Sequence, residues 1–255
     1  MNIRVIGCSG GELPGHNAPG FLLDDEIVFD AGSITSALSL KAQLRIKHVF
    51  ITHAHLDHVR SIPFLADNIV FEAKRKKIEI YSISPVITAI RNHLFKSSVW
   101  PDFTSIPGPD DAVLNLVKVR AEKPLMINGY SITPYRVSHP VPAVGYLVED
   151  SSGSRFFYTG DTGPTPSTWK KIGNRDIHCI IIDVSFPNAL KDTAVNTGHL
   201  TPGLLKEELS KMSHLPERIC ITHPKPQFFK TIKSELAGLR MKNIRVLKDG
   251  DIIRI

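Results

Sequence analysis

The segment Thr52 to His58, which reads THAHLDH, limits the architectures open to this chain more than any other stretch. It follows the apolar run His48 to Ile51 and contains four side chains that bind divalent ions such as Zn²⁺: His53, His55, Asp57 and His58. In an extended segment, residues two apart point the same way, so the first two histidines can bind one ion together. A turn after Leu56 would direct the other two side chains toward a second position nearby.

The other ligands must come from elsewhere in the chain, because two four-coordinate ions share about eight ligand positions. Four residues lie just after an apolar run or just before a helix start, which is where α/β proteins build their sites: His139, Asp161, His199 and His223. Alone, each could be a structural histidine or a turn aspartate. Their combination with THAHLDH favours metal binding.

The apolar pattern predicts two successive blocks of strands and helices, and therefore one domain over residues 1–255 with two sheets sharing a core and helices outside. The strands are expected over residues 3–6, 21–23, 27–29, 48–51, 78–82, 114–119, 131–137, 144–148, 156–159, 177–183, 218–222, 244–247 and 252–255. Helices are expected after Ser33, over 59–77, from Ser84, over 165–172, from Thr201 and over 226–239.

Composition narrows the setting. The chain has 255 residues, of which 42% are hydrophobic and 22% charged, which is ordinary for a globular protein. Cys179 and Cys220 lie in apolar runs, so we interpret them as small buried side chains rather than a disulfide. The N-terminus lacks the long apolar core of a signal peptide, and no run approaches the roughly 20 apolar residues that span a bilayer. We therefore expect a cytosolic protein without a membrane partner.

Charge gives a weaker indication. The formal net charge is +6 and the pI about 9.2, which favours anionic substrates or nucleic acid. The densest basic cluster, Lys74 to Lys77, has Glu72 and Glu79 beside it. This mixture is more typical of a solvated helix end than of a nucleic-acid-binding patch.

Residues 94–111 form an expected lid-like insertion. The segment has no clear period and contains three prolines, together with Trp100 and Phe103. A loop of this length inside a compact domain is usually functional or disordered. The two aromatic residues favour a packed lid.

Taken in order, the motifs HAHLDH, SHP, TGDTG and THP resemble those of the metallo-β-lactamase superfamily. The resemblance implies a four-layer αββα sandwich with two mixed sheets, outer helices and a site for two divalent ions, Zn²⁺ or else Mn²⁺. It assigns the first ion to His53, His55, His139 and Asp161, and the second to Asp57, His58, Asp161 and His223. Asp161 would bridge the ions, and Asp30 would support the site. True β-lactamases often carry cysteine where Asp161 stands, so antibiotic hydrolysis is less expected.

Finer matches resemble class II 3′,5′-cyclic nucleotide phosphodiesterases. These are Val59 with Ser61-Ile62-Pro63 after HAHLDH, SVWPDF at 98–103, IDVSFPN at 182–188 and TGHLTP at 197–202. Such enzymes usually have glutamate where Asp183 stands and are commonly homodimers. The resemblance implies hydrolysis of cyclic AMP or cyclic GMP to the 5′-monophosphate, in some relatives to degrade antiviral signals.

These resemblances suggest roles for individual side chains. Asp57 would orient the attacking water and accept its proton, while His199, held by Asp183, would protonate the leaving oxygen. Trp100 or Phe103 could stack on a nucleobase or simply pack the lid onto the protein. Further substrate contacts are expected from Ser185, Asn188, His16 and Asn17.

Two other functions remain open. An RNase Z-like or other nucleic-acid phosphodiesterase is favoured by the basic pI, although the long glycine- and proline-rich arm that RNase Z uses to hold tRNA is not evident. A non-catalytic metal-binding or ligand-binding module is disfavoured by the full ligand set and by the additional His199.

Overall fold

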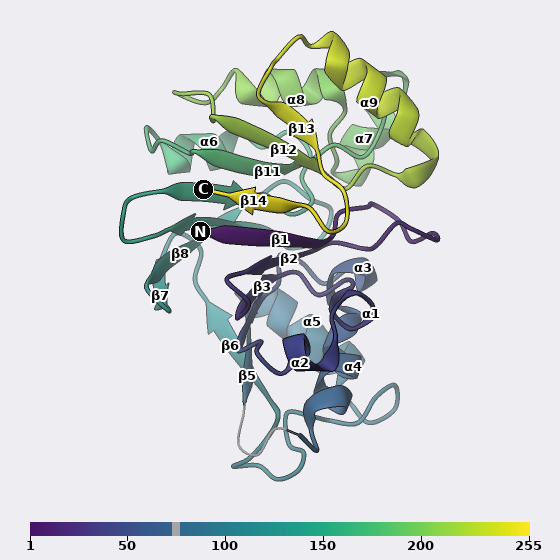
Figure 1. The fold of residues 1–255 in the computed structure, drawn as a ribbon, viewed down its shortest axis with the longest axis vertical. Helices are drawn as coiled ribbons and strands as arrows, with labels where there is room; N and C mark the ends of the chain where they lie inside the picture. The colour runs from purple at the N-terminus through teal and green to yellow at the C-terminus, as the bar shows by residue number, and fades with distance from the viewer. Residues whose placement is uncertain (73–76) are drawn as a thin grey trace.

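The computed structural model describes residues 1–72 and 77–255. Residues 73–76, which include most of the basic cluster expected at a helix end, lie outside the described residues. Two seven-stranded sheets pack face to face, and helices cover their outer surfaces (Figure 1). The predicted four-layer αββα sandwich with two mixed sheets is confirmed.

The first sheet combines an antiparallel part with a parallel part. Its strands follow the order β14, β1, β2, β3, β4, β5, β6, and pairing is parallel from β3 to β6. In chain order they are β1 (Asn2–Gly7), β2 (Gly20–Leu23), β3 (Ile27–Phe29), β4 (His48–Phe50), β5 (Ile78–Ile83), β6 (Leu114–Val119) and β14 (Ile252–Arg254).

The second sheet has the order β13, β12, β11, β10, β9, β8, β7, with parallel pairing from β13 to β10 and antiparallel pairing beyond. Its strands are β7 (Leu125–Ile127), β8 (Tyr130–Arg136), β9 (Val144–Glu149), β10 (Arg155–Tyr158), β11 (Cys179–Asp183), β12 (Arg218–Thr222) and β13 (Ile244–Val246). The parallel strands β10, β11 and β12 run side by side, so their carboxyl ends meet at one edge.

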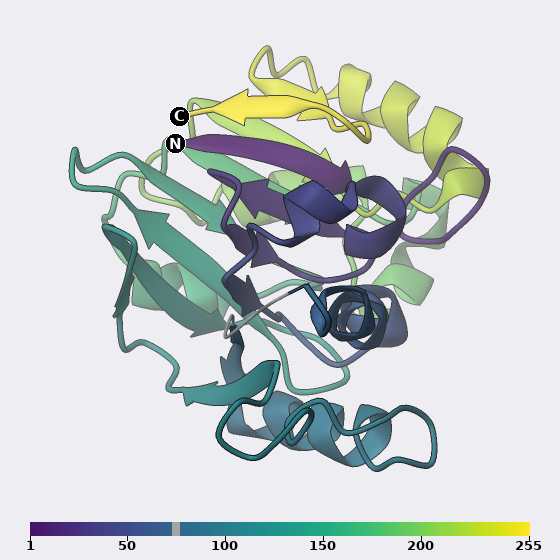
Figure 2. The same cartoon turned by 60° about the horizontal axis from the view of Figure 1, so that its bottom comes forward.

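Helices from the two halves of the chain cover opposite faces (Figure 2). The first sheet carries α1 (Ile34–Ala37), α2 (Leu40–Gln43), α3 (Leu56–Val59), α4 (Ser61–Ile69) and α5 (Ser84–Leu94). The second carries α6 (Pro166–Ile172), α7 (Lys191–Thr197), α8 (Pro202–Leu209) and α9 (Phe229–Gly238). Within the described residues, none of these helices has the length and apolar character needed to cross a membrane.

Several predicted elements differ in detail. The helix expected after Ser33 is two short helices, because Leu38 is extended and Ser39 then caps α2 by accepting a hydrogen bond from the Ala42 amide. The helix expected to reach Lys77 ends at Ile69. Strand β7 and helix α7 were not predicted.

An aromatic layer joins the two sheets beneath the THAHLDH segment. The ring of Phe29 in β3 lies 5.5 Å from that of Phe50 in β4 and 5.6 Å from that of Phe156 in β10, measured between centroids. All three side chains are buried, and burying a phenylalanine contributes about 1.5–3 kcal/mol. The strand that leads into the THAHLDH segment is therefore anchored in the core.

The 94–111 segment packs onto the first half of the molecule. Phe103 is only 3% exposed and belongs to the hydrophobic core, and its carbonyl accepts a hydrogen bond from the Leu114 amide. The ring of Trp100 makes an edge contact with Phe64 of α4, with centroids 4.9 Å apart. Both aromatic side chains of this segment therefore pack against the first half of the molecule.

Candidate metal centre

Three imidazole nitrogens converge where the chain leaves β4. The Nε2 atom of His53 lies 3.0 Å from Nδ1 of His55, and Nε2 of His139 lies 3.3 Å from the same Nδ1. Ligands about 2.0–2.1 Å from a tetrahedral zinc ion are about 3.3 Å from one another. The three histidines and Asp161 form one group able to hold a divalent ion.

A second group forms around α3, which begins at Leu56 and so places Asp57 and His58 in its first turn. The Nε2 atom of His223 lies 3.4 Å from Oδ2 of Asp57, and Nε2 of His58 lies 3.3 Å from Oδ2 of Asp161. The His58 nitrogen is buried and has no hydrogen-bond partner. A metal ion would supply the missing partner, so these residues fit a second ion.

Asp161 lies between the two groups. Its Oδ2 atom is 3.3 Å from Nε2 of His223 and 3.7 Å from Nε2 of His53. The residue before it, Gly160, has a positive φ of 61°, and a β-carbon there would come within 2.7 Å of Thr52. This glycine lets the Asp161 loop approach the histidine segment closely enough for one carboxylate to serve both groups.

Asp30 orients the second group from behind. Its buried carboxylate accepts hydrogen bonds from the Thr52 amide at 2.8 Å, the Thr52 hydroxyl at 2.8 Å and the Tyr158 hydroxyl at 2.7 Å. The fourth donor is Nδ1 of His58, also at 2.8 Å. Because this bond fixes a proton on Nδ1, Nε2 is the atom left to bind a metal ion.

Two more candidate ligands are oriented in the same way. Nδ1 of His139 donates to the Gly198 carbonyl at 2.9 Å. Nδ1 of His223 lies 2.8 Å from the Ser185 hydroxyl, which in turn donates to Asp183 at 2.5 Å. In both histidines the other nitrogen, Nε2, faces the ligand group.

Asp183 also holds His199 beside the two groups. Its Oδ2 atom lies 2.7 Å from Nδ1 of His199, which is buried with 8% of the residue exposed. The His199 ring stacks on that of His223 at 5.2 Å and 15°. Burial lowers the pKa of His199, but the neighbouring Asp183 carboxylate raises it more, so the net pKa lies above its usual value.

Burial and neighbouring carboxylates both shift the pKa values of the candidate ligands. Burial lowers the pKa of His53 strongly, and those of His55 and His139 to a lesser degree, which favours the neutral imidazole that binds metals. Burial lowers the pKa of His58 as well, but Asp161 and Asp30 outweigh it and raise the net pKa well above its usual value. Binding an ion at His58 would therefore displace a proton.

The residues expected to contact substrate are more scattered. Ser185 is buried behind His223, and Asn188 accepts a hydrogen bond from the Gly203 amide at the start of α8. His16 contacts the Ser9 hydroxyl at 3.2 Å, and the side chain of Asn17 donates to the Ile6 carbonyl. Phe103 is in the core and Trp100 packs on Phe64, which favours the packing alternative for both.

Sequence reasoning missed several residues that shape the centre. Thr52 and Tyr158 supply three of the hydrogen bonds to Asp30. Tyr158 ends β10 three residues before Asp161, so its position near the site could have been suspected, but its inward direction depends on the strand register. The Gly198 carbonyl could not have been identified, because backbone acceptors carry no sequence signal.

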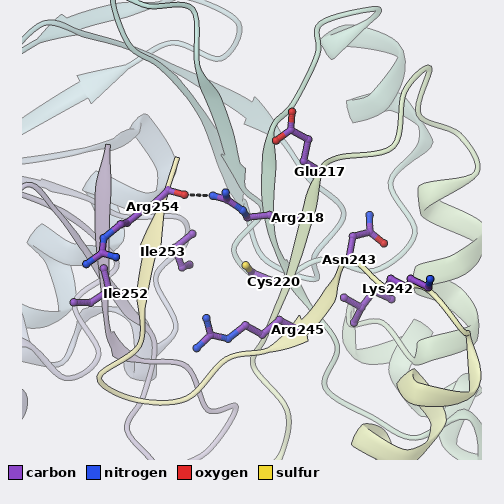
Figure 3. Close-up of a pocket in the computed structure, with 10 residues that line it drawn as sticks. Glu217, Arg218, Cys220, Lys242, Asn243, Arg245, Ile252, Ile253 and Arg254 are labelled. Carbon is purple, nitrogen blue, oxygen red and sulfur yellow. Dashed lines mark hydrogen bonds between the residues drawn. The ribbon is translucent and has the colours of Figure 1, made fainter.

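Two hollows differ in their relation to the centre. The first, of about 260 Å³, adjoins His55 and is named the apolar hollow here for its lining: Ala54, His55, Pro85, Val86, Ala89, Val141 and Pro142. The second, of about 450 Å³, opens at the start of β12, and Figure 3 shows Arg218, Cys220 and Arg245 on its walls. The His223 ligand follows the opposite end of β12, so the second hollow lies apart from the centre.

Comparison with known proteins gives consistent matches. Residues 27–223 match the family model described as the beta-lactamase superfamily domain. A Yersinia pestis protein named as a probable 3′,5′-cyclic-nucleotide phosphodiesterase is 31% identical over 208 residues, covering 72% of this chain and 58% of that protein. A ribonuclease Z from Methanococcus maripaludis is 28% identical over 158 residues, covering 58% and 48%. The chain thus spans about half the length of these curated relatives.

A solved structure supports the same fold. The crystal structure of unliganded yeast PDE1 superposes with a TM-score of 0.85 at 19% identity, covering 100% of this chain and 99% of that one. At this level of identity the likeness concerns the fold alone.

Proposed function

Because this chain belongs to the β-lactamase superfamily, we propose that it is a dinuclear metal-dependent phosphodiesterase that hydrolyses 3′,5′-cyclic nucleotides to 5′-monophosphates. The observation that carries the proposal is the pair of ligand groups that share Asp161, with the Asp183–His199 pair beside them. Zn²⁺ suits the histidine-rich donors best, and Mn²⁺ is the alternative. Such ions would supply an activated water and offset charge on the phosphoryl oxygens.

Side chains of the protein would orient the attacking water and transfer the protons. Asp57 keeps 37% of its side chain exposed, unlike the buried Asp161, so it can orient the attacking water and accept its proton. His199, fixed by Asp183 through Nδ1, keeps Nε2 for the leaving 3′-oxygen. Protonation of that oxygen completes ring opening, and such proton transfer typically contributes about 10²–10⁴-fold to the rate.

One variant pair tests this division. We expect His199→Ala to keep both ions and lose about 10²–10⁴-fold in kcat, because the two proposed ion sites use other ligands and Nδ1 of His199 is held by Asp183. The same experiment tests the other arrangement that the geometry allows, in which Asp161, Asp183, His199 and His223 hold an ion together. Asp161→Asn, the matched change in the shared ligand, should lose ions and turnover together. Metal content per chain, measured beside kcat, separates the two outcomes. Equal loss of metal in both variants would contradict the role of His199.

The ribonuclease Z relative and the basic pI favour a second candidate, cleavage of a tRNA precursor. A substrate panel decides between them. Zn²⁺- or Mn²⁺-loaded protein is incubated with cyclic AMP, cyclic GMP and a tRNA precursor. Cleavage of the RNA alone would replace the first proposal, and metal binding without any turnover would indicate a binding module.

The proposal also covers the cellular location, the oligomeric state and the biological role of the protein. The three cysteines are unpaired, which supports a cytosolic location. We infer a homodimer from the resemblance to class II phosphodiesterases, and light scattering of the purified protein tests it. A role in degrading cyclic-nucleotide immune signals rests on the same resemblance. Expression of the active and His199→Ala forms in cells that carry such signalling tests that role.

A further inference from the structure

We propose that the apolar hollow beside His55 holds the nucleobase of the substrate by shape and apolar contact, so that the enzyme accepts adenine and guanine almost equally. The inference rests on the proposed function and specifies its substrate range. It replaces Trp100 and Phe103 as the base-binding element, since neither lines the hollow.

The hollow is continuous with the metal centre. Ala54 and His55 lie within the ligand segment itself, and Val141 and Pro142 follow the ligand His139 by two and three residues. Helix α5 closes the remaining side. A substrate with its phosphate at the ligands would therefore find an apolar hollow directly beside the first ligand group.

The size of the hollow suits part of a ligand. At about 260 Å³ it is below the roughly 300–1,000 Å³ of cavities that enclose a whole drug-sized ligand. A hollow of this size can hold one ring system. The ribose and phosphate would then lie outside it, toward the histidines. In a cyclic nucleotide the base is the one apolar, planar part, so it is the part that gains from this surface.

The chemistry of the walls sets the specificity. Among the described residues that line the hollow, His55 alone has a polar side chain, and its Nδ1 already belongs to the first ligand group. The side chains therefore offer no dedicated hydrogen-bond partner to the base edge. Sites that hydrogen-bond a substrate group reject analogues by about 10⁴–10⁵-fold, whereas apolar pockets discriminate by only about 10–200-fold. Adenine and guanine have the same ring system and differ only in edge groups.

The test is a substitution on α5 whose larger side chain fills the hollow. Ala89 is half-buried on its wall, and the next residue toward the N-terminus, Thr88, is exposed and does not line it. We expect Ala89→Trp to raise KM for cyclic AMP and cyclic GMP at least tenfold, with two ions per chain retained. Thr88→Trp, the matched control, should keep the wild-type KM. Val141→Trp fills the hollow from the opposite wall and serves as the second variant if Ala89→Trp does not fold.

The wild-type enzyme gives the second readout. We expect kcat/KM for cyclic AMP and cyclic GMP to agree within about tenfold, because apolar walls do not read the base edge. A preference above about 10³-fold, or an unchanged KM in both filled variants, would overturn the proposal. If no cyclic nucleotide is hydrolysed, the proposed function fails. Binding of AMP and GMP to the metal-loaded protein then decides whether the hollow holds a nucleobase. Loss of that binding in Ala89→Trp would support the hollow, and no binding or unchanged binding would refute it.

Discussion

Replacing Asp30 by asparagine tests how the fold prepares a metal ligand. The change keeps the size of the side chain but replaces one acceptor oxygen by an amide donor. The Thr52 amide can only donate, so the new side-chain oxygen must stay opposite it. The new amide group then faces Nδ1 of His58 and the Tyr158 hydroxyl. The hydroxyl can rotate to accept, but His58 must move its proton to Nε2, which removes the lone pair that would bind the ion.

The expected magnitude follows from this tautomer change. Loss of an orienting partner typically lowers metal affinity by about 10–100-fold. We therefore expect Asp30→Asn to lower the affinity for the second ion by this factor. The metal-free protein should also lose about 1.5–3 kcal/mol in unfolding free energy, the range for a hydrogen bond to a charged group. Titration against a competing chelator measures the affinity of each ion, and denaturant unfolding measures the stability.

Tyr158→Phe is the control for this experiment. It removes one hydrogen bond to Asp30 but leaves the contact with His58 intact. We expect a stability loss of about 1 kcal/mol or more, with both ions bound at close to wild-type affinity. If Asp30→Asn binds the second ion as the wild type does, the proposed orientation of His58 is refuted. Equal loss of affinity in Tyr158→Phe would show that general destabilisation explains the effect.

Three further changes have defined outcomes. Gly198→Ala should lower affinity for the first ion, because φ is +71° there and a β-carbon would lie 2.8 Å from Nδ1 of His139; wild-type affinity in chelator titration would contradict this. Ser185→Ala should lower the affinity for the second ion by about 10–100-fold, since it removes the hydrogen-bond partner of His223. Equal affinities in this variant and the wild type would argue against the orientation of His223 by Ser185. Trp100→Ala should lower the melting temperature yet leave KM for cyclic nucleotides within twofold, and a large rise in KM would return this residue to the base-binding site.

The clustering of the candidate ligands was predictable, because each follows an element with a clear signal. The apolar strands β4, β10 and β12 are evident in the sequence, and parallel strands bring their carboxyl ends to one edge. β10 and β12 belong to one sheet, so Asp161 and His223 meet at its edge, with Oδ2 of Asp161 3.3 Å from Nε2 of His223. β4 belongs to the other sheet, so the approach of His53 to Asp161 depends on how the two sheets pack. The alternation of side chains along an extended segment likewise places His53 beside His55.

The parts that were not predictable depend on contacts distant in sequence. Whether Phe103 faces a substrate or the core is decided by packing against the first sheet, and composition alone left both alternatives open. The break at Leu38 follows from the capping of α2 by Ser39. The apolar hollow is lined by residues from α5 and from the loop after β8, so no local sequence pattern predicts it.

The most direct test of the account is product analysis on the metal-loaded protein. The protein, carrying a measured number of Zn²⁺ or Mn²⁺ ions, is incubated with cyclic AMP, and the products are separated and identified. We expect two ions per chain and conversion to 5′-AMP, with loss of both after Asp161→Asn. A protein that binds two ions and leaves cyclic nucleotides intact, while it cleaves a tRNA precursor, would contradict this expectation.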